Sequence, residues 1–140
     1  MIDKFVWRDE YSVGIPSIDD QHKQFFLITD EIIDLLLKKD KTMEELRASA
    51  FKLGDYASYH LKTEEGYFDH LNYPDAPRHV HEHDLYRQKV AYYLRELEKP
   101  EVDVPRLAEE IANYSITWLS HHILQTDKQY TIFFQEHGVK

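Results

Sequence analysis

The chain has 140 residues, of which 42% are apolar, enough to fill the core of one domain, and we take residues 1–140 as that domain. Its formal net charge of -9 argues against nucleic acid or anionic lipid as a partner, because both favour a basic face. The chain contains no cysteine, which excludes disulfides, thiolate zinc sites, iron–sulfur clusters and thiol catalysis.

The N-terminal sequence lacks the basic region and apolar run of a signal peptide. No apolar run approaches the roughly 18 residues that a membrane-spanning helix needs. We therefore expect a soluble, cytoplasmic protein that binds neither nucleic acid nor a membrane.

Residues 1–16 are expected to form an extended arm whose apolar side chains lie along the surface of the folded domain. Gly14 and Pro16 break any helix within this arm. The first helix is predicted over 17–38, with Ser17 as its N-cap and acidic residues in its first turn.

Three further helices follow, joined by short connections. The second is predicted over 42–71, where Thr42 followed by Glu45 has the spacing of a capping box. The third begins near Asp75 and ends before Pro100. The fourth begins after Asp103 and is predicted to continue without a break to about residue 136.

Four helices of this length with tight loops predict an all-α, up-down-up-down antiparallel four-helix bundle over residues 17–136, preceded by the arm. Bundles of this kind build interior ligand sites from side chains on facing helices. The inward-facing polar residues are therefore the candidates for function.

The stretch "PDAPRHVHEHDLY" contains three closely spaced histidines, which cannot all face the same way. A helix advances about 100° per residue, so His79 and His83 share one face, with Tyr86 and Val90 continuing it. His81 lies about 200° round from His79. We expect His79 and His83 to face the core and His81, like His70 and His137, to face solvent.

The other helices carry comparable groups. His60 and Glu64 lie four residues apart on one apolar face, which favours Glu64 over its neighbour Glu65. On the fourth helix the phase of the apolar residues favours His122 over His121, although Asp127 then lies about 140° round from His122. With one histidine from the first helix, the predicted inward set is His22, His60, Glu64, His79, His83, His122 and Asp127.

A metal centre satisfies such a set most economically. Buried ionised carboxylates cost several kcal/mol unless they are paired or bound to metal, and no lysine or arginine faces them in the apolar stripes. Structural zinc takes four ligands and calcium and magnesium prefer oxygen, whereas mixed imidazole and carboxylate ligands suit iron. Seven groups are too many for one ion. If both carboxylates bridge two ions with an oxide or hydroxide, one coordination position stays open.

The ligand balance predicts gentle chemistry. Ferritin-like di-iron sites use mainly glutamates, whereas histidine dominates here, which disfavours highly oxidised iron. The sequence also suggests no acid or base in the core beyond the ligands. Both points favour reversible oxygen binding over oxygen cleavage.

The segments "FVWRDEYSVGIPSIDDQHK", "YHLKTEE", "YPDAPRHVHEH" and "WLSHHILQTDKQY" together carry the pattern H…HxxxE…HxxxH…HxxxxD. In this pattern, and over nearly its whole length, the chain resembles the hemerythrins, in particular the single-domain bacteriohemerythrins. The resemblance implies a non-haem di-iron centre in a hemerythrin-like domain.

The resemblance also implies a division of the ligands. One iron would be held by His79, His83 and His122, and the other, with the open position, by His22 and His60. Two carboxylates and an oxo or hydroxo group would bridge the ions. Residues expected to shield bound dioxygen from water are Phe25, Phe26, Trp118, Leu119 and Ile123.

The predicted function is reversible dioxygen binding, for carriage, storage or delivery, without enzymatic turnover. The alternatives on the same site are a di-iron oxidase, a peroxidase, a nitric-oxide-processing protein, or an oxygen or redox sensor that acts through a separate partner. Iron storage ranks last, because a closed histidine-rich site for two ions is a poor store.

Overall fold

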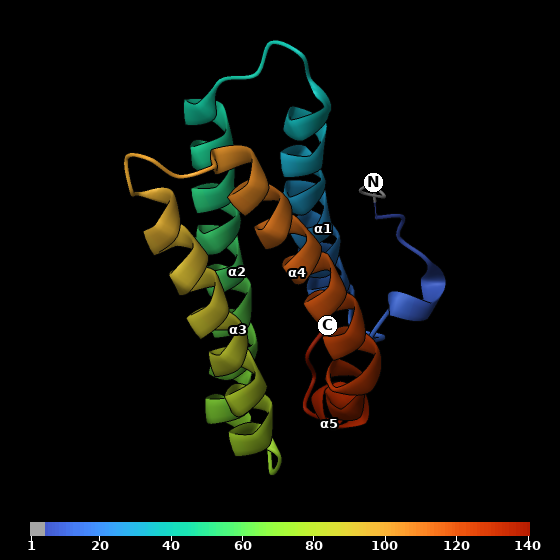
Figure 1. Ribbon diagram of the computed structural model, residues 1–140. Coiled ribbons are helices and arrows are strands. Elements are labelled where there is room, and N and C mark those ends of the chain that lie inside the picture. Colours follow the sequence, from blue (N-terminus) through green and yellow to red (C-terminus); the bar gives the residue numbers. More distant parts are fainter. Residues whose placement is uncertain (1–4) are drawn as a thin grey trace.

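The computed structural model of the protein describes residues 5–140, which form an antiparallel four-helix bundle (Figure 1). Successive long helices alternate in direction, and no strand occurs among these residues, so the predicted all-α up-down-up-down fold is confirmed. The helices are α1 (Pro16–Leu37), α2 (Met43–Leu71), α3 (Ala76–Leu97) and α4 (Val104–Gln125). Three short elements complete the chain: the 3₁₀ helices η1 (Asp9–Tyr11) and η2 (Asp127–Tyr130), and α5 (Thr131–Glu136).

The starts of α1 and α2 follow local sequence signals, although the signal at α1 is not the predicted one. Thr42 caps α2 as predicted, with its hydroxyl accepting from the Glu45 amide at 3.1 Å. The predicted N-cap at Ser17 is wrong, because α1 already begins at Pro16, whose fixed φ suits the first helical position. The Asp19 carboxylate, expected only to favour the first turn, instead accepts hydrogen bonds from the Val13 amide and the Ser12 hydroxyl, at 2.8 and 2.5 Å.

The fourth predicted helix is interrupted. Instead of continuing to residue 136, α4 ends at Gln125, and Thr126 leads into η2 and then α5. The Thr126 hydroxyl donates to the Glu82 carboxylate on α3, at 2.9 Å from Oε1. The Gln129 amide then bonds the Thr126 carbonyl in the tighter 3₁₀ pattern, at 3.1 Å. The break therefore coincides with a contact between α3 and the end of α4. The periodicity of a single helix cannot predict such a contact.

The N-terminal arm packs closely on the bundle. Val13 and Ile15 are at most 1% exposed, so the arm contributes to the core as well as lying along its surface. The Thr131 hydroxyl donates to the Val13 carbonyl at 2.6 Å, and the side-chain amide of Gln135 donates to the Gly14 carbonyl at 2.8 Å. The predicted arm is thus extended except at η1, and it is fixed to α5; residues 1–4 of the predicted arm lie outside the described range.

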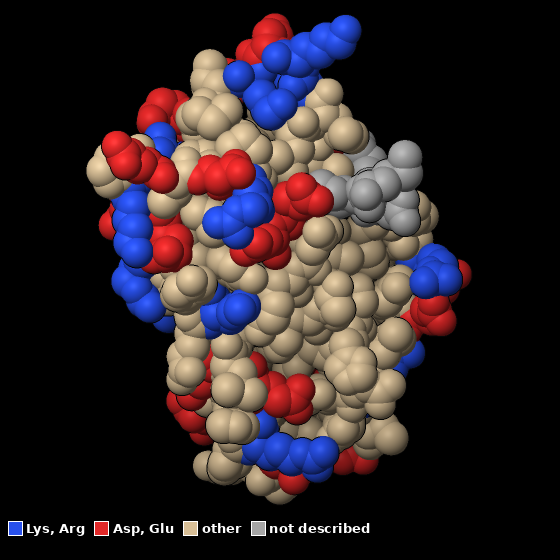
Figure 2. All heavy atoms as spheres, viewed as in Figure 1, with Lys and Arg blue, Asp and Glu red and all other residues tan. Residues whose placement is uncertain are grey.

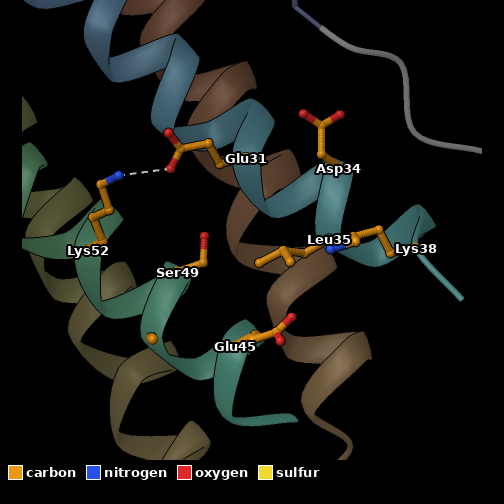
Figure 3. A pocket seen from close by; sticks show the side chains of 8 residues that line it. Glu31, Asp34, Leu35, Lys38, Glu45, Ser49 and Lys52 are labelled. Atoms are coloured by element: carbon orange, nitrogen blue, oxygen red, sulfur yellow. Dashed lines mark hydrogen bonds and ion pairs between the residues drawn. The ribbon is translucent and has the colours of Figure 1, made fainter. Parts of the chain in front are cut away.

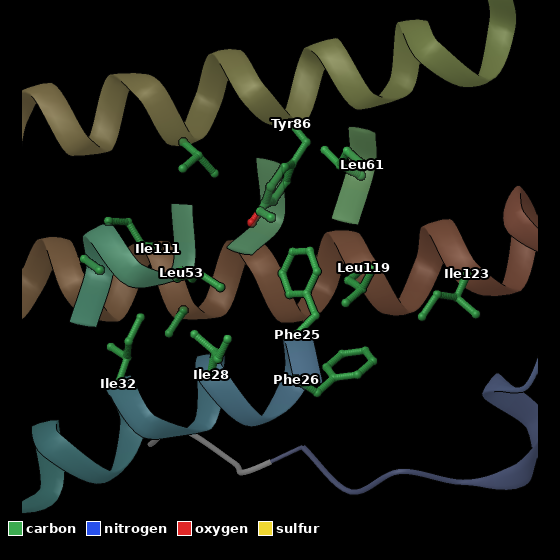
Figure 4. Close-up of a cluster of buried hydrophobic side chains, with 14 of the residues drawn as sticks. Phe25, Phe26, Ile28, Ile32, Leu53, Leu61, Tyr86, Ile111, Leu119 and Ile123 are labelled. Atoms are coloured by element: carbon green, nitrogen blue, oxygen red, sulfur yellow. The ribbon is translucent and has the colours of Figure 1, made fainter. Parts of the chain in front are cut away.

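All four helices contribute apolar side chains to a continuous core (Figure 4). In the face seen in Figure 2, lysine and arginine side chains are interspersed with acidic ones around an uncharged central area. Among residues 5–140, no helix combines the length and the apolar character needed to cross a membrane.

The turn after α2 requires an unusual backbone conformation at Asn72, and substitutions there can test its energetic cost. Asn72 has φ 56°, in the left-handed region that alanine reaches only at a cost of roughly 1–2 kcal/mol. Asn72→Ala should therefore lower the free energy of unfolding by about 1 kcal/mol in denaturant titrations. The matched control Asn72→Gly should not lose stability, and equal losses in both variants would contradict the conformational explanation.

Candidate metal centre

The seven predicted inward residues meet in the interior of the bundle. Each is at most 2% exposed, and they come from all four long helices and η2. They fall into two overlapping groups, in each of which the candidate ligand atoms lie within 4.8 Å of one another. The three-histidine group is Glu64, His79, His83, His122 and Asp127, and the two-histidine group is His22, His60, Glu64 and Asp127.

Asp127 stands between the two groups. Its Oδ1 lies 3.0 Å from Nε2 of His79 and 3.0 Å from Nε2 of His122, whereas its Oδ2 lies 3.1 Å from Nε2 of His22. Each oxygen therefore faces a different group of imidazoles. This is the arrangement that a carboxylate bridging two ions requires.

The interruption of α4 explains how Asp127 reaches this place. In a continuous helix Asp127 would point about 140° away from His122. Because the chain leaves the helix at Thr126 and tightens into η2, the Asp127 carboxylate instead lies beside the His122 imidazole. The wide angular offset in the sequence is thus resolved by a change of helix type.

Glu64 faces both groups through one oxygen. Its Oε1 lies 3.2 Å from Nε2 of His83, 3.6 Å from that of His60 and 3.9 Å from that of His79. Its Oε2 accepts a hydrogen bond from the Tyr130 hydroxyl at 2.5 Å.

Tyr130 is a core acid that the sequence analysis missed. It is fully buried, and burial together with the charges of Asp127 and Glu64 raises its pKa well above the ordinary value. It therefore keeps its proton and acts as a donor to Glu64. The expectation of a core without acids beyond the ligands is wrong; the position of Tyr130, three residues after Asp127, was the available signal.

The donor atoms of the cluster fit a metal. Among the described residues, seven buried side-chain nitrogen and oxygen atoms lack a hydrogen-bond partner, and all belong to this cluster. Six of them are candidate ligand atoms: Nε2 of His22, His60 and His83, Oε1 of Glu64, and both Oδ of Asp127. Buried polar atoms are normally satisfied, so these converging lone pairs are suited to coordination, and the mixture of imidazole and carboxylate suits iron.

A second set of side chains lies behind the imidazoles. The Nδ1 atoms of His122, His83 and His60 lie 3.1, 2.8 and 2.8 Å from oxygens of Glu82, Glu65 and Gln21, respectively. Metal-binding histidines usually make such contacts, which fix the tautomer and the ring orientation. In the sequence, Glu65 stands out only as the neighbour of Glu64, and no motif marks Gln21 or Glu82. The position of these three residues on the helix surface, next to the face that carries the ligands, is the one sequence feature that could have identified them.

The two carboxylate partners, Glu82 and Glu65, remain ionised. Hydrogen bonds from His122 and Thr126 overcome the effect of burial and lower the pKa of Glu82 to about 2. Burial disfavours the charge of Glu65, but hydrogen bonds from His83 and Arg87 outweigh it and lower its pKa to about 2. Both imidazoles thus have a negative charge behind them.

The five residues predicted to shield the site differ in position. Phe25, Leu119 and Ile123 are fully buried, and the Phe25 ring lies 6.1 Å from that of His60. Trp118 is partly exposed and stacks on the His122 ring at 4.3 Å. Phe26 instead stacks on Phe5 of the arm. As expected, the histidines outside the cluster are exposed, namely His70, His81, His121 and His137.

A groove between α1 and α2 has a volume of about 510 Å³ and lies apart from the cluster (Figure 3). An ion pair between Lys52 and Glu31, 3.0 Å long, crosses its edge. No candidate ligand lines it, so it is not part of the metal centre. Its lining residues are Glu31, Asp34, Leu35, Lys38, Glu45, Ala48, Ser49 and Lys52.

Fold and cluster together define a metal-binding four-helix bundle, and comparison with known proteins agrees. The sequence matches the family described as the Hemerythrin HHE cation binding domain over residues 13–131. It is 32% identical over 133 residues to a bacteriohemerythrin of Clostridium acetobutylicum, covering 90% of this chain and 98% of the relative. It is 29% identical to a bacteriohemerythrin of Pseudomonas paraeruginosa, covering 89% of this chain and 78% of the relative.

Structural comparison leads to the same family. A crystal structure of wild-type hemerythrin matches with a TM-score of 0.81 and 25% sequence identity, covering 93% of this chain and 97% of that chain. The chain belongs to the hemerythrin family. That family is a non-haem di-iron family, as the resemblance in the sequence implied.

The charge state of the cluster predicts a pH dependence. Burial disfavours the charged form of His122, but Asp127 and Glu82 outweigh it and raise its pKa to about 10. At neutral pH this imidazole therefore holds a proton that a metal must displace. Metal affinity should rise with pH from about pH 6 to about pH 8, by about tenfold per unit for one released proton.

Calorimetric titrations in buffers of different ionisation enthalpy would count the released protons. His81→Ala, which changes an exposed histidine, should give the same dependence. Metal affinity that did not change with pH would show that His122 is unprotonated or does not bind the metal.

Proposed function

We propose that the protein binds two iron ions in this cluster and uses them to bind dioxygen reversibly. The observation that carries the proposal is the placement of Asp127, whose two oxygens face two separate groups of histidines. His79, His83 and His122 would hold one ion, and His22 and His60 the other. Glu64 and Asp127 would bridge them, together with an oxo or hydroxo group.

When bound, two ferrous ions supply the electrons and the open coordination position that dioxygen requires. The residues around them exclude water. Phe25, Leu119 and Ile123 are fully buried and apolar, and in the proposed site they would limit the access of water and protons. A dry, apolar environment favours release of the ligand over its further reduction.

The orientation of Glu64 depends on Tyr130. Because the phenol donates to Oε2, Oε1 is directed at the imidazoles of both groups. The raised pKa of Tyr130 keeps the proton on the phenol oxygen through neutral pH. Tyr130 is thus a positioning residue for the proposed bridge.

The same phenol favours a second candidate function. A buried tyrosine hydrogen-bonded to a bridging carboxylate could donate a proton or an electron to an activated oxygen species, as a di-iron oxidase or peroxidase requires. The preponderance of five histidines over two carboxylates favours oxygen binding, because fewer anionic ligands stabilise highly oxidised iron less well.

The ligand assignment predicts the metal content of variants. Glu64→Ala should reduce the iron content from two ions to one or none, because a shared carboxylate is lost. His81→Ala is the matched control, since this histidine is exposed on the same helix as His79 and should leave the iron content unchanged. Iron analysis of the purified variants measures both, and two ions in Glu64→Ala would remove Glu64 from the site.

Reversibility is tested by absorbance spectra of the iron-loaded, reduced protein without oxygen, with oxygen, and after oxygen is removed. We expect a charge-transfer band that forms with oxygen and disappears when it is removed. Immediate and permanent conversion to a ferric spectrum would reject reversible binding and favour the oxidase or peroxidase. In that case Tyr130→Phe should slow the conversion while retaining both ions.

A further inference from the structure

The imidazoles of the two groups differ in what lies behind them. In the three-histidine group, Nδ1 of His122 lies 3.1 Å from Glu82 and Nδ1 of His83 lies 2.8 Å from Glu65. In the two-histidine group, Nδ1 of His60 instead lies 2.8 Å from the neutral side chain of Gln21. Nδ1 of the second member, His22, is buried and has no hydrogen-bond partner among residues 5–140.

This difference has a chemical consequence for metal binding. An imidazole that binds metal through Nε2 carries its proton on Nδ1, and a carboxylate that accepts this proton makes the ring a stronger donor. An amide oxygen fixes the ring orientation but adds no charge. Both carboxylate-backed imidazoles belong to one group, so that group offers the stronger donors as well as the larger number.

The two carboxylates differ in their other contacts. The oxygens of Glu82 also accept from the Thr126 hydroxyl, at 2.9 and 3.1 Å, and Thr126 directly precedes Asp127. Glu82 therefore connects the orientation of His122 with the turn that presents Asp127. By contrast, the charge of Glu65 is partly offset by Arg87, which forms two hydrogen bonds of 2.8 Å with it.

We propose that Glu82 and Glu65 make the three-histidine position the tighter of the two metal positions, so that the first ion binds there and the second binds beside His22 and His60. The inference rests on the proposed two-ion function and adds the order in which the ions bind. Glu82 and Glu65 act through the ligands as positioning residues.

The test is an anaerobic titration of the apo protein with Co²⁺, followed by calorimetry and by the visible absorbance of the bound ion. The wild type should bind two ions in two resolved steps. Glu82→Gln preserves the size of the side chain and an acceptor for His122 but removes the charge. It should weaken the first step by about 10- to 100-fold and leave the second nearly unchanged. Glu65→Gln should weaken the same step by a smaller factor.

Two further variants assign the steps and separate charge from structural damage. His60→Ala should retain only the first step, which identifies the position that fills first. Gln21→Glu places a carboxylate behind His60 and should strengthen the second step, narrowing the gap between the two affinities. A gain in affinity cannot arise from a damaged fold.

The outcomes separate this inference from the proposed function. A wild-type chain that bound fewer than two ions would overturn the two-ion function itself. With two ions bound, the inference is overturned if Glu82→Gln weakens both steps equally or neither. It is also overturned if Gln21→Glu leaves the second step unchanged, or if His60→Ala abolishes the first.

Discussion

Two carboxylates and five imidazoles share a small volume from which solvent is excluded. Burying these charges costs free energy, and the contacts around the cluster offset that cost. Glu64 and Asp127 have no exposed surface, and an uncompensated buried charge of this kind costs several kcal/mol. Without metal, protons provide the compensation: despite burial, the carboxylates around His83 and His122 raise the pKa of both imidazoles. A bound cation would replace these protons, so metal binding and protonation are alternative ways of neutralising one cluster.

The geometry of the cluster depends on the place where regular structure stops. Four straight helices can direct histidines and Glu64 inward by periodicity alone, but Asp127 needs the interruption at Thr126. The hydrogen bond from Thr126 to Glu82 joins that interruption to α3, where Glu82 also contacts His122. Among the candidate ligands, Glu82 contacts His122, which belongs to the three-histidine group alone, and its effect on metal binding is therefore expected to be specific to that position.

The surroundings of the cluster bear on the proposed chemistry in two opposite ways. The Phe25 ring, which is fully buried, lies 6.1 Å from the His60 ring, and an apolar neighbour of this kind suits the reversible binding of a small neutral gas that we propose. Tyr130 adds a phenol in contact with Glu64, a feature that also suits oxidative chemistry.

Local patterns were sufficient to place the four long helices and to predict the inward direction of most candidate ligands, but they did not predict the end of α4 at Gln125. Helical periodicity describes rotation about one axis, so it correctly separated the buried His79 and His83 from the exposed His81, and His122 from His121. The cap at Thr42 is equally local, since donor and acceptor are three residues apart. The predicted cap at Ser17 failed where the adjacent Pro16 had a stronger preference for the first helical position.

Helical periodicity does not show which residues of one helix lie opposite which residues of another. Four side chains hold the candidate ligands through hydrogen bonds to residues between 18 and 66 positions away, and these bonds form only once the helices are packed. They are Gln21, Glu65, Glu82 and Tyr130. The break before Asp127 coincides with a contact of the same kind, since the hydrogen-bond partner of Thr126 lies 44 residues earlier on α3. The sequence by itself determined the helical bundle and which residue types point into it. Only the tertiary structure decided which partners hold them there, because those contacts join separate helices.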